Sequence, residues 1–184
     1  MSGIGHNNGP TMEPGHGWRR HAWVRARADL LPTLPIEVVR LRVRRAAEIG
    51  LDYRTYASFR AASGHDVVAL LFSTNALRLL PPRPALPEDR RARLAAVAGT
   101  ERGALANRPL SPEVVLARAG TVIDRAHPAP RPFAAWGEAR RAVRAALTCP
   151  ADRVLMVGDT AEERLWAEAA GLGLYLPAER YFPA

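Results

Sequence analysis

Residues 153–171, with the sequence RVLMVGDTAEERLWAEAAG, constrain the fold of this chain more than any other segment. A short apolar run at 154–157 stops at Gly158, Asp159 and Thr160, and a segment with helical periodicity follows it. This order of strand, tight turn and helix places a carboxylate at the carboxyl-terminal tip of a buried strand. Because ligands of open α/β sheets bind in the crevice at such tips, the segment predicts both an α/β fold and the position of a site.

A second apolar run, DVVALLF at 66–72, is rich in β-branched and aromatic residues, as expected for a strand that is buried on both faces. The other elements that we expect are a helix at 88–98, a weak extended segment at 103–107, a helix that begins at 111–113, a loop at 126–132, a helix at 133–147 and a short strand at 174–176. Trp136 and Trp166 fall on apolar helix faces and are expected in the core. Strands separated by helices of this length pair in parallel. The sequence therefore predicts an α/β fold, a parallel sheet flanked by helices in a Rossmann-like arrangement.

The N-terminal third of the chain has a different texture. Residues 1–17 are rich in Gly, Asn and His without periodicity, which indicates a flexible arm, and residues 18–64 indicate a helical N-terminal segment rich in arginine. Asp52 is placed to cap a helix at 53–62. We therefore divide the chain into an arm at 1–17, a helical segment at 18–64 and an α/β domain at 65–184.

Composition limits the kinds of protein that this chain can be. Its 184 residues are enough for one domain with a sizeable core, and no apolar run approaches the roughly 20 residues that a membrane span needs. The N-terminus lacks the apolar region of a secretory signal, and a lone cysteine suits a reducing compartment, so we expect a cytoplasmic protein. The formal net charge is +8 and every basic side chain is arginine, which excludes Schiff-base and P-loop lysines.

Asp159 and Glu163 lie one helical turn apart at the start of the helix that follows the strand at 154–157. This spacing can bring both carboxylates to one side of the helix start, where they could hold a divalent cation such as Mg²⁺. A second interpretation needs no ligand: Asp159 and Thr160 cap the helix, and Glu162 and Glu163 complement its positive N-terminus. The sequence leaves both interpretations open.

The same segment resembles the fourth motif of the haloacid dehalogenase-like hydrolases. In that motif an apolar strand ends in Gly-Asp-Ser/Thr-x-x-Asp, and an Ala-Ala-Gly run commonly follows in the next helix. Residues 154–171 are similar to this pattern, with Glu163 where the family usually has aspartate. The resemblance implies a haloacid dehalogenase-like fold and an acidic pair, Asp159 and Glu163, that helps to hold magnesium.

The catalytic motifs of that family are altered in this chain. The family attacks its substrate with the first aspartate of an Asp-x-Asp-x-Thr motif, and no Asp-x-Asp occurs here. Aligned on LFSTNAL, Ser73 replaces the nucleophilic aspartate and Asn75 the acid/base aspartate, while Arg108 stands in for the lysine of the third motif. A serine without a base is a poor nucleophile, and an amide cannot shuttle a proton. An arginine can still bind a phosphate or a carboxylate.

The sequence therefore predicts a polar pocket without standard hydrolase activity. Its candidate members are Ser73, Asn75, Arg108, Asp159 and Thr160, with Asp159 and Glu163 as candidate metal ligands. Such a pocket would bind a small anionic ligand or Mg²⁺, and the protein would be a pseudoenzyme.

An alternative function is that of a non-catalytic adaptor that contacts nucleic acid or an acidic protein partner. Arg40, Arg42, Arg44 and Arg45 form the densest basic patch of the chain and could follow a phosphate backbone. The other interpretation of these residues is a solvated helix face with salt bridges to nearby glutamates.

Overall fold

The computed structural model describes residues 34–82 and 85–183. The arm expected at 1–17 and the first part of the helical segment expected at 18–64 lie outside the described residues. The chain divides into two compact units, Met1–Val39 and Arg40–Ala184, and the second unit holds the sheet.

Five parallel strands form the sheet: β1 (Ala69–Ser73), β2 (Glu101–Ala106), β3 (Arg125–Pro128), β4 (Val154–Gly158) and β5 (Leu174–Pro177). Their order across the sheet is β3-β2-β1-β4-β5, and every neighbouring pair is parallel. This is the order of the doubly wound dinucleotide-binding sheet without its sixth strand. The predicted α/β fold with a parallel sheet flanked by helices is confirmed.

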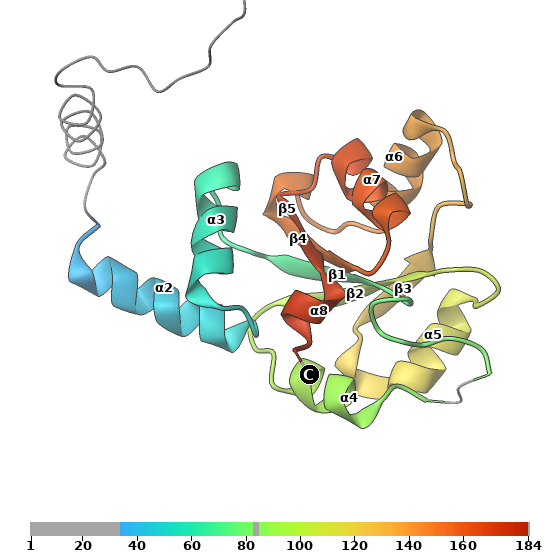
Figure 1. Ribbon diagram of the computed structural model, residues 1–184, viewed down its shortest axis with the longest axis horizontal. Helices are drawn as coiled ribbons and strands as arrows, with labels where there is room; N and C mark the ends of the chain where they lie inside the picture. Colours follow the sequence, from blue (N-terminus) through green and yellow to red (C-terminus); the bar gives the residue numbers. More distant parts are fainter. Residues whose placement is uncertain (1–33, 83–84, 184) are drawn as a thin grey trace, which may run out of the picture. The chain divides into compact units, whose positions relative to one another are not determined.

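Helices cover both faces of the sheet. The helices α4 (Glu88–Ala95) and α5 (Pro112–Ala119) lie on one face, and α6 (Trp136–Ala145) and α7 (Ala161–Ala170) lie on the other (Figure 1). Leu70 and Phe72 of β1 pack in the core of the α4–α5 face, whereas Ala69 and Leu71 pack in the core of the α6–α7 face. Since both faces of β1 are buried, its sequence is a continuous apolar run rather than an alternating one.

The remaining elements are shorter or lie before the sheet. They are α2 (Ile36–Glu48), α3 (Tyr53–Ser63), the 3-10 helices η1 (Gly120–Val122) and η2 (Ala151–Arg153), and α8 (Ala178–Tyr181). Among the described residues, no helix combines the length and the apolar character that crossing a bilayer requires.

The start of α3 follows the sequence prediction. Asp52 caps this helix, because its carboxylate accepts a hydrogen bond from the backbone N–H of Thr55 at 2.8 Å. Tyr56 and Phe59 of α3 are buried in the same core as Phe72 of β1. The helix expected at 53–62 is therefore part of the packing around the sheet.

Three features differ from the expectations. The predicted loop at 126–132 contains most of β3, an edge strand that pairs only with β2 and has half-buried or exposed residues, so it does not need an apolar sequence. The helix expected from 133 begins at Trp136, because Phe133 has a left-handed φ of +57° that a helix cannot continue. Trp136 is 55% exposed, so its predicted place in the core is wrong, whereas Trp166 is buried as predicted.

Candidate functional site

The carboxyl ends of β1 and β4 lie side by side in the sheet, because these strands are hydrogen-bonded neighbours. From β1 the chain passes to the β2 side of the sheet, and from β4 it passes to the β5 side. The helices that follow the two strands, α4 and α7, pack on opposite faces (Figure 1). Residues 73–75 and 158–160 therefore flank a topological switch point, where doubly wound sheets open a crevice for ligands.

Glu163 is the polar centre of this edge, since its side chain is fully buried and its carboxylate accepts four hydrogen bonds. Oε1 accepts from Asn75 Nδ2 at 2.9 Å and from Asn107 Nδ2 at 3.1 Å. Oε2 accepts from the backbone N–H groups of Asp159 at 2.6 Å and Thr160 at 3.1 Å. One carboxylate thus joins the ends of three neighbouring strands, β1, β2 and β4.

Thr160 and Glu163 also form a capping box at the start of α7. Thr160 Oγ1 accepts the N–H of Glu163 at 3.2 Å, and the Glu163 carboxylate returns to the N–H of Thr160. The interpretation that Thr160 caps this helix is confirmed. Because the chain's own carboxylate fills the positive helix N-terminus, an external anion must bind elsewhere at this edge.

The same hydrogen bonds decide how well the acidic pair suits Mg²⁺. Each oxygen of Glu163 already has two N–H donors, and these hydrogens would point at any cation on that carboxylate. Glu163 is therefore unsuited to direct coordination, while Asp159 is exposed and can reach a cation. Within the part of the chain that the structure describes, no three metal-binding side chains cluster.

The structure brings together four of the candidate residues, which are Asn75, Asp159, Thr160 and Glu163. Ser73 lies at the same edge but is fully buried, and its Oγ accepts the N–H of Ala76 at 3.0 Å within its own turn. Arg108 is exposed in the loop that follows β2. Neither Ser73 nor Arg108 takes part in the hydrogen bonds around Glu163.

Sequence reasoning missed Asn107 as a site residue. Its side chain donates to Glu163, its backbone N–H donates to Thr74 Oγ1 at 3.0 Å, and its Oδ1 is buried without a hydrogen-bond partner among the described residues. A signal was present, because a polar residue directly after an extended segment falls at the same edge as the other strand tips of a parallel sheet.

Tyr175 of β5 is a second missed residue, and its sequence context gives no signal for it. Its hydroxyl donates to the backbone carbonyl of Thr160 at 3.0 Å, and its ring covers Gly158 so closely that a Cβ there would meet it at 2.6 Å. Burial, followed by the nearby charge of Glu163, raises the pKa of Tyr175 to about 12. Tyr175 therefore stays a neutral hydrogen-bond donor beside the loop that carries Asp159.

A hollow of about 330 Å³ opens beside Asp159. Its charged lining residues are Arg78, Asp89, Arg90, Asp159 and Glu179. Arg78 is the last residue of the turn after β1, and Arg90 belongs to α4. These two residues supply, next to Asp159, the positive charge that the sequence assigns to Arg108.

The four arginines of the alternative function do not share one environment. Arg45 donates hydrogen bonds to Asp66 Oδ2 at 3.1 Å, to the Gly99 carbonyl at 3.0 Å and to Thr100 Oγ1 at 2.8 Å. It ties α2 to the segments before β1 and β2 instead of facing solvent with its neighbours. Of the others, Arg40 and Arg44 are exposed and Arg42 is half-buried.

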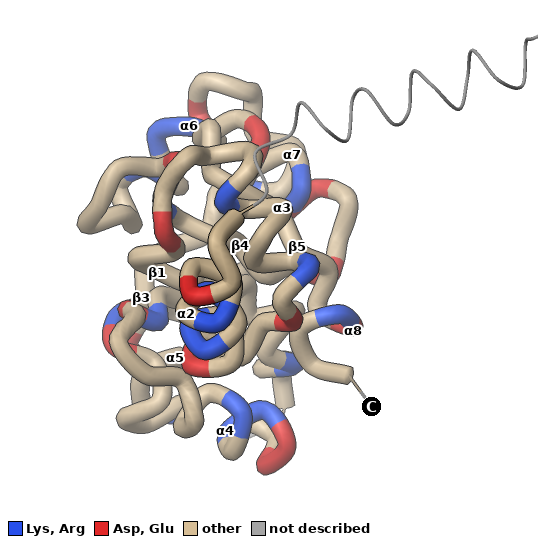
Figure 2. The backbone as a smooth tube through the Cα atoms, turned by 90° about the vertical axis from the view of Figure 1, so that its left-hand side faces the viewer, with Lys and Arg blue, Asp and Glu red and all other residues tan. Residues whose placement is uncertain are grey.

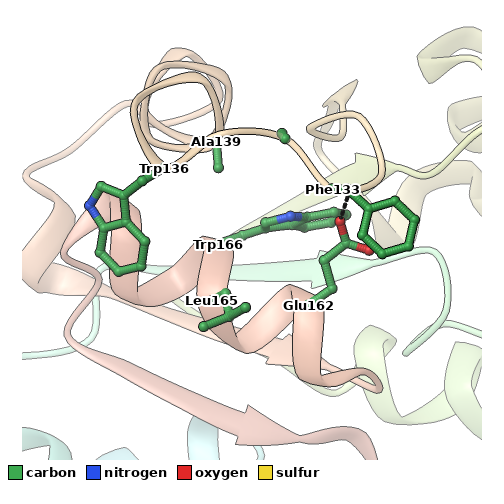
Figure 3. Close-up of a pocket in the computed structure, with 7 residues that line it drawn as sticks. Phe133, Trp136, Ala139, Glu162, Leu165 and Trp166 are labelled. Carbon is green, nitrogen blue, oxygen red and sulfur yellow. Dashed lines mark hydrogen bonds between the residues drawn. The ribbon is translucent and has the colours of Figure 1, made fainter.

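A second hollow, of about 410 Å³, lies between α6 and α7. Figure 3 shows the rings of Phe133, Trp136 and Trp166 around it, with Leu165 and Glu162 on α7. The carboxylate of Glu162 accepts the backbone N–H of Phe133, whose ring is 96% exposed. This hydrogen bond holds the loop before α6 against the first turn of α7.

The residues at the carboxyl edge can bind and orient a small polar molecule. Asn75 and Asn107 use their amide N–H groups to hydrogen-bond the Glu163 carboxylate. Asp159, Arg78 and Arg90 line an accessible hollow beside it. Comparisons with known proteins found no family model, no curated protein and no solved structure that matches this chain.

Proposed function

We propose that this chain is a haloacid dehalogenase-like protein that binds a small anionic ligand at the carboxyl edge of its sheet and lacks standard hydrolase activity. The segment that resembles the fourth motif of that family forms β4, the following turn and α7, with Asp159 exposed at the switch point. Ligand binding at this place is the general behaviour of doubly wound sheets.

The observation that carries the proposal is the hydrogen bond that Asn75 donates to the buried carboxylate of Glu163 at 2.9 Å. In the resembled family the position aligned with Asn75 is an aspartate that moves a proton. A carboxylate at that distance from Glu163 would repel it. The amide removes this repulsion and also removes the group that could act as acid or base.

Ser73 supports the same conclusion from the nucleophile position. Its hydroxyl is fully buried and accepts a backbone N–H from its own turn. Attack on phosphorus or carbon requires an accessible oxygen that a base can deprotonate. Binding without turnover is the activity that these side chains support.

The test combines a binding measurement with a search for turnover. In ¹H–¹⁵N spectra we expect inorganic phosphate and simple phosphate esters to perturb amide resonances at 73–78 and 158–160, while those of Glu101 and Val154, at the opposite edge, stay in place. We expect no phosphate release from p-nitrophenyl phosphate in the presence of Mg²⁺. The proposal fails if the anions perturb no strand-tip resonance, or if phosphate is released and Asp159→Ala abolishes the release.

Magnesium binding stays a prediction for Asp159 alone. The expected result is that any rise in melting temperature with Mg²⁺ disappears in Asp159→Ala and persists in Glu168→Ala, which removes an exposed carboxylate from the other end of α7. A rise that persists in Asp159→Ala would place the cation elsewhere.

A further inference from the structure

Arg90 is a buried cation whose hydrogen-bonding capacity is not used within the described residues. Its side chain is in α4, the residue is 4% exposed, and its Nε and Nη1 are buried without a hydrogen-bond partner. The guanidinium carbon lies 4.3 Å from the centroid of the Phe182 ring, which provides a cation–π contact but no acceptor. Asp89 and Asp159 attract the Arg90 guanidinium electrostatically, but neither accepts a hydrogen bond from it.

This arrangement differs from that of the other arginines. Among the described residues, Arg90 is the one arginine with two buried nitrogens that lack a partner. A guanidinium carries five N–H donors in a planar fork that matches the oxygens of a phosphate or a carboxylate. Leaving such a group buried and unpaired is strongly unfavourable, so a site that keeps it is expected to receive an oxyanion from outside.

Arg90 and Arg78 both line the 330 Å³ hollow beside Asp159. Arg78 has a left-handed φ of +53°, a conformation that favours glycine over a long side chain. A glycine would adopt this backbone conformation with less strain. We infer that the arginine is present for its side chain. Two arginines therefore line one hollow at the edge of the sheet where ligands of this fold bind.

The hollow also contains carboxylates, which constrain the ligand further. Asp89, Asp159 and Glu179 line it together with the two arginines. Figure 2 shows acidic positions at one end of α4 and basic positions beside them. A purely anionic ligand would gain from the guanidinium groups and be repelled by the three carboxylates, whereas a ligand with an amine as well as an oxyanion complements both.

We propose that this hollow binds a small zwitterion, with a phosphate or carboxylate group at Arg90 and Arg78 and an amine at Asp159 and Glu179. This inference rests on the proposed function and specifies its ligand class. It assigns Asp159 the role of binding an amine and Arg90 the role of binding an oxyanion.

Two ligands that differ in one group test the amine. O-phosphoethanolamine carries both groups, and ethyl phosphate lacks the amine, so we expect the first to bind about twofold to fivefold more tightly in an NMR titration, as one exposed ion pair would give. Asp159→Asn should weaken O-phosphoethanolamine and strengthen ethyl phosphate, because it removes both an attraction and a repulsion. β-Alanine and propionate form the matching carboxylate pair and show which oxyanion the arginines prefer.

Two substitutions test the oxyanion end. Arg90→Met keeps an unbranched side chain with an apolar stem and removes the buried charge, so it should abolish binding of all four compounds and raise the melting temperature. Arg78→Gly should weaken binding without lowering the melting temperature, because glycine accepts the left-handed backbone. Arg140→Met, which replaces an exposed arginine of α6, is the control and should leave binding unchanged.

The possible outcomes separate the two proposals. If ethyl phosphate binds as tightly as O-phosphoethanolamine and both are lost in Arg90→Met, the zwitterion is wrong and anion binding stands. If no compound perturbs the strand tips, both proposals fail. If Arg90→Met lowers the melting temperature and leaves binding intact, Arg90 is a structural residue and the inference is overturned.

Discussion

The hydrogen bonds around Glu163 predict how strongly its substitution should destabilise the chain. Glu163→Ala removes the acceptor for four N–H donors, two from backbone and two from the amides of Asn75 and Asn107. Hydrogen bonds to a charged acceptor contribute about 1.5–3 kcal/mol each, but the buried carboxylate also loses several kcal/mol of hydration on folding. The net effect is therefore much smaller than the sum of four bonds.

The exposure of the donors reduces the effect further. Asp159 and Thr160 are exposed, so water can solvate their N–H groups in the variant, and Asn75 is half-buried and can turn toward solvent. Asn107, whose Oδ1 already lacks a partner, is the donor least able to recover. Leaving one buried donor unsatisfied costs about 1–3 kcal/mol, so we expect Glu163→Ala to lower the unfolding free energy by about 3 kcal/mol.

Glu163→Gln should destabilise the chain less. The glutamine oxygen can keep the two backbone donors, and its NH₂ group then faces the two asparagine amides. Asn107 can rotate and present its unpartnered Oδ1 to that group, which restores one hydrogen bond. We expect a loss of about 1–2 kcal/mol, since neutral hydrogen bonds contribute about half as much as charge-assisted ones.

Urea unfolding followed by circular dichroism measures these differences, with the midpoint compared at constant slope. Glu168→Gln, in the last turn of the same helix, is the matched control and should change the unfolding free energy by no more than about 0.5 kcal/mol. The reasoning is refuted if Glu163→Ala falls within the range of the control, or if Glu163→Gln is more destabilising than Glu163→Ala.

Three other predictions concern Arg45, Tyr175 and the two tryptophans Trp136 and Trp166. Arg45→Ala should lower the unfolding free energy by about 2–3 kcal/mol in the same urea assay, because it removes several hydrogen bonds between α2 and the segments before β1 and β2. Arg44→Ala, on the exposed face, is the control and should change it by less than about 0.5 kcal/mol. Burial raises the pKa of Tyr175 from 10.0 to about 12, so the folded state keeps a proton that the unfolded chain releases; stability should fall as pH rises from 10 to 12, and Tyr175→Phe should flatten that part of the pH–melting curve. Trp166→Ala should cost about 3–5 kcal/mol and Trp136→Ala about 1 kcal/mol or less, as thermal unfolding would show, since the first ring is buried and the second is 55% exposed; equal losses would contradict the packing described here.

The buried strands could be predicted from sequence because their physical signal is local. β1 and β4 are covered on both faces, so each is an apolar run that reveals itself without knowledge of its neighbours. β3 gives no such signal, because it is short, lies at the edge and has residues that are only partly buried. Its strand conformation depends on pairing with β2, which is a tertiary contact.

The site could be predicted in part for the same reason. Asp159, Thr160 and Glu163 lie in one continuous segment, so their spacing and their place at the helix start are visible in the sequence. Asn107 and Arg90 reach the edge from other elements, and their roles depend on packing that no local pattern encodes. The hydrogen bonds of Glu163 also could not be foreseen, because they require three strands to end together.

The position of β1 between β2 and β4 has a consequence for synthesis on the ribosome. β2 follows β1 closely along the chain, but β4 lies roughly 80 residues further on. At a synthesis rate of about 5–20 residues per second, the edge of β1 that pairs with β4 stays unpaired for about 4–16 s. During that interval Leu70, Leu71 and Phe72 form an open strand edge of the kind that pairs with other chains, so nascent chains that stall before β4 are the ones that a holding chaperone should capture.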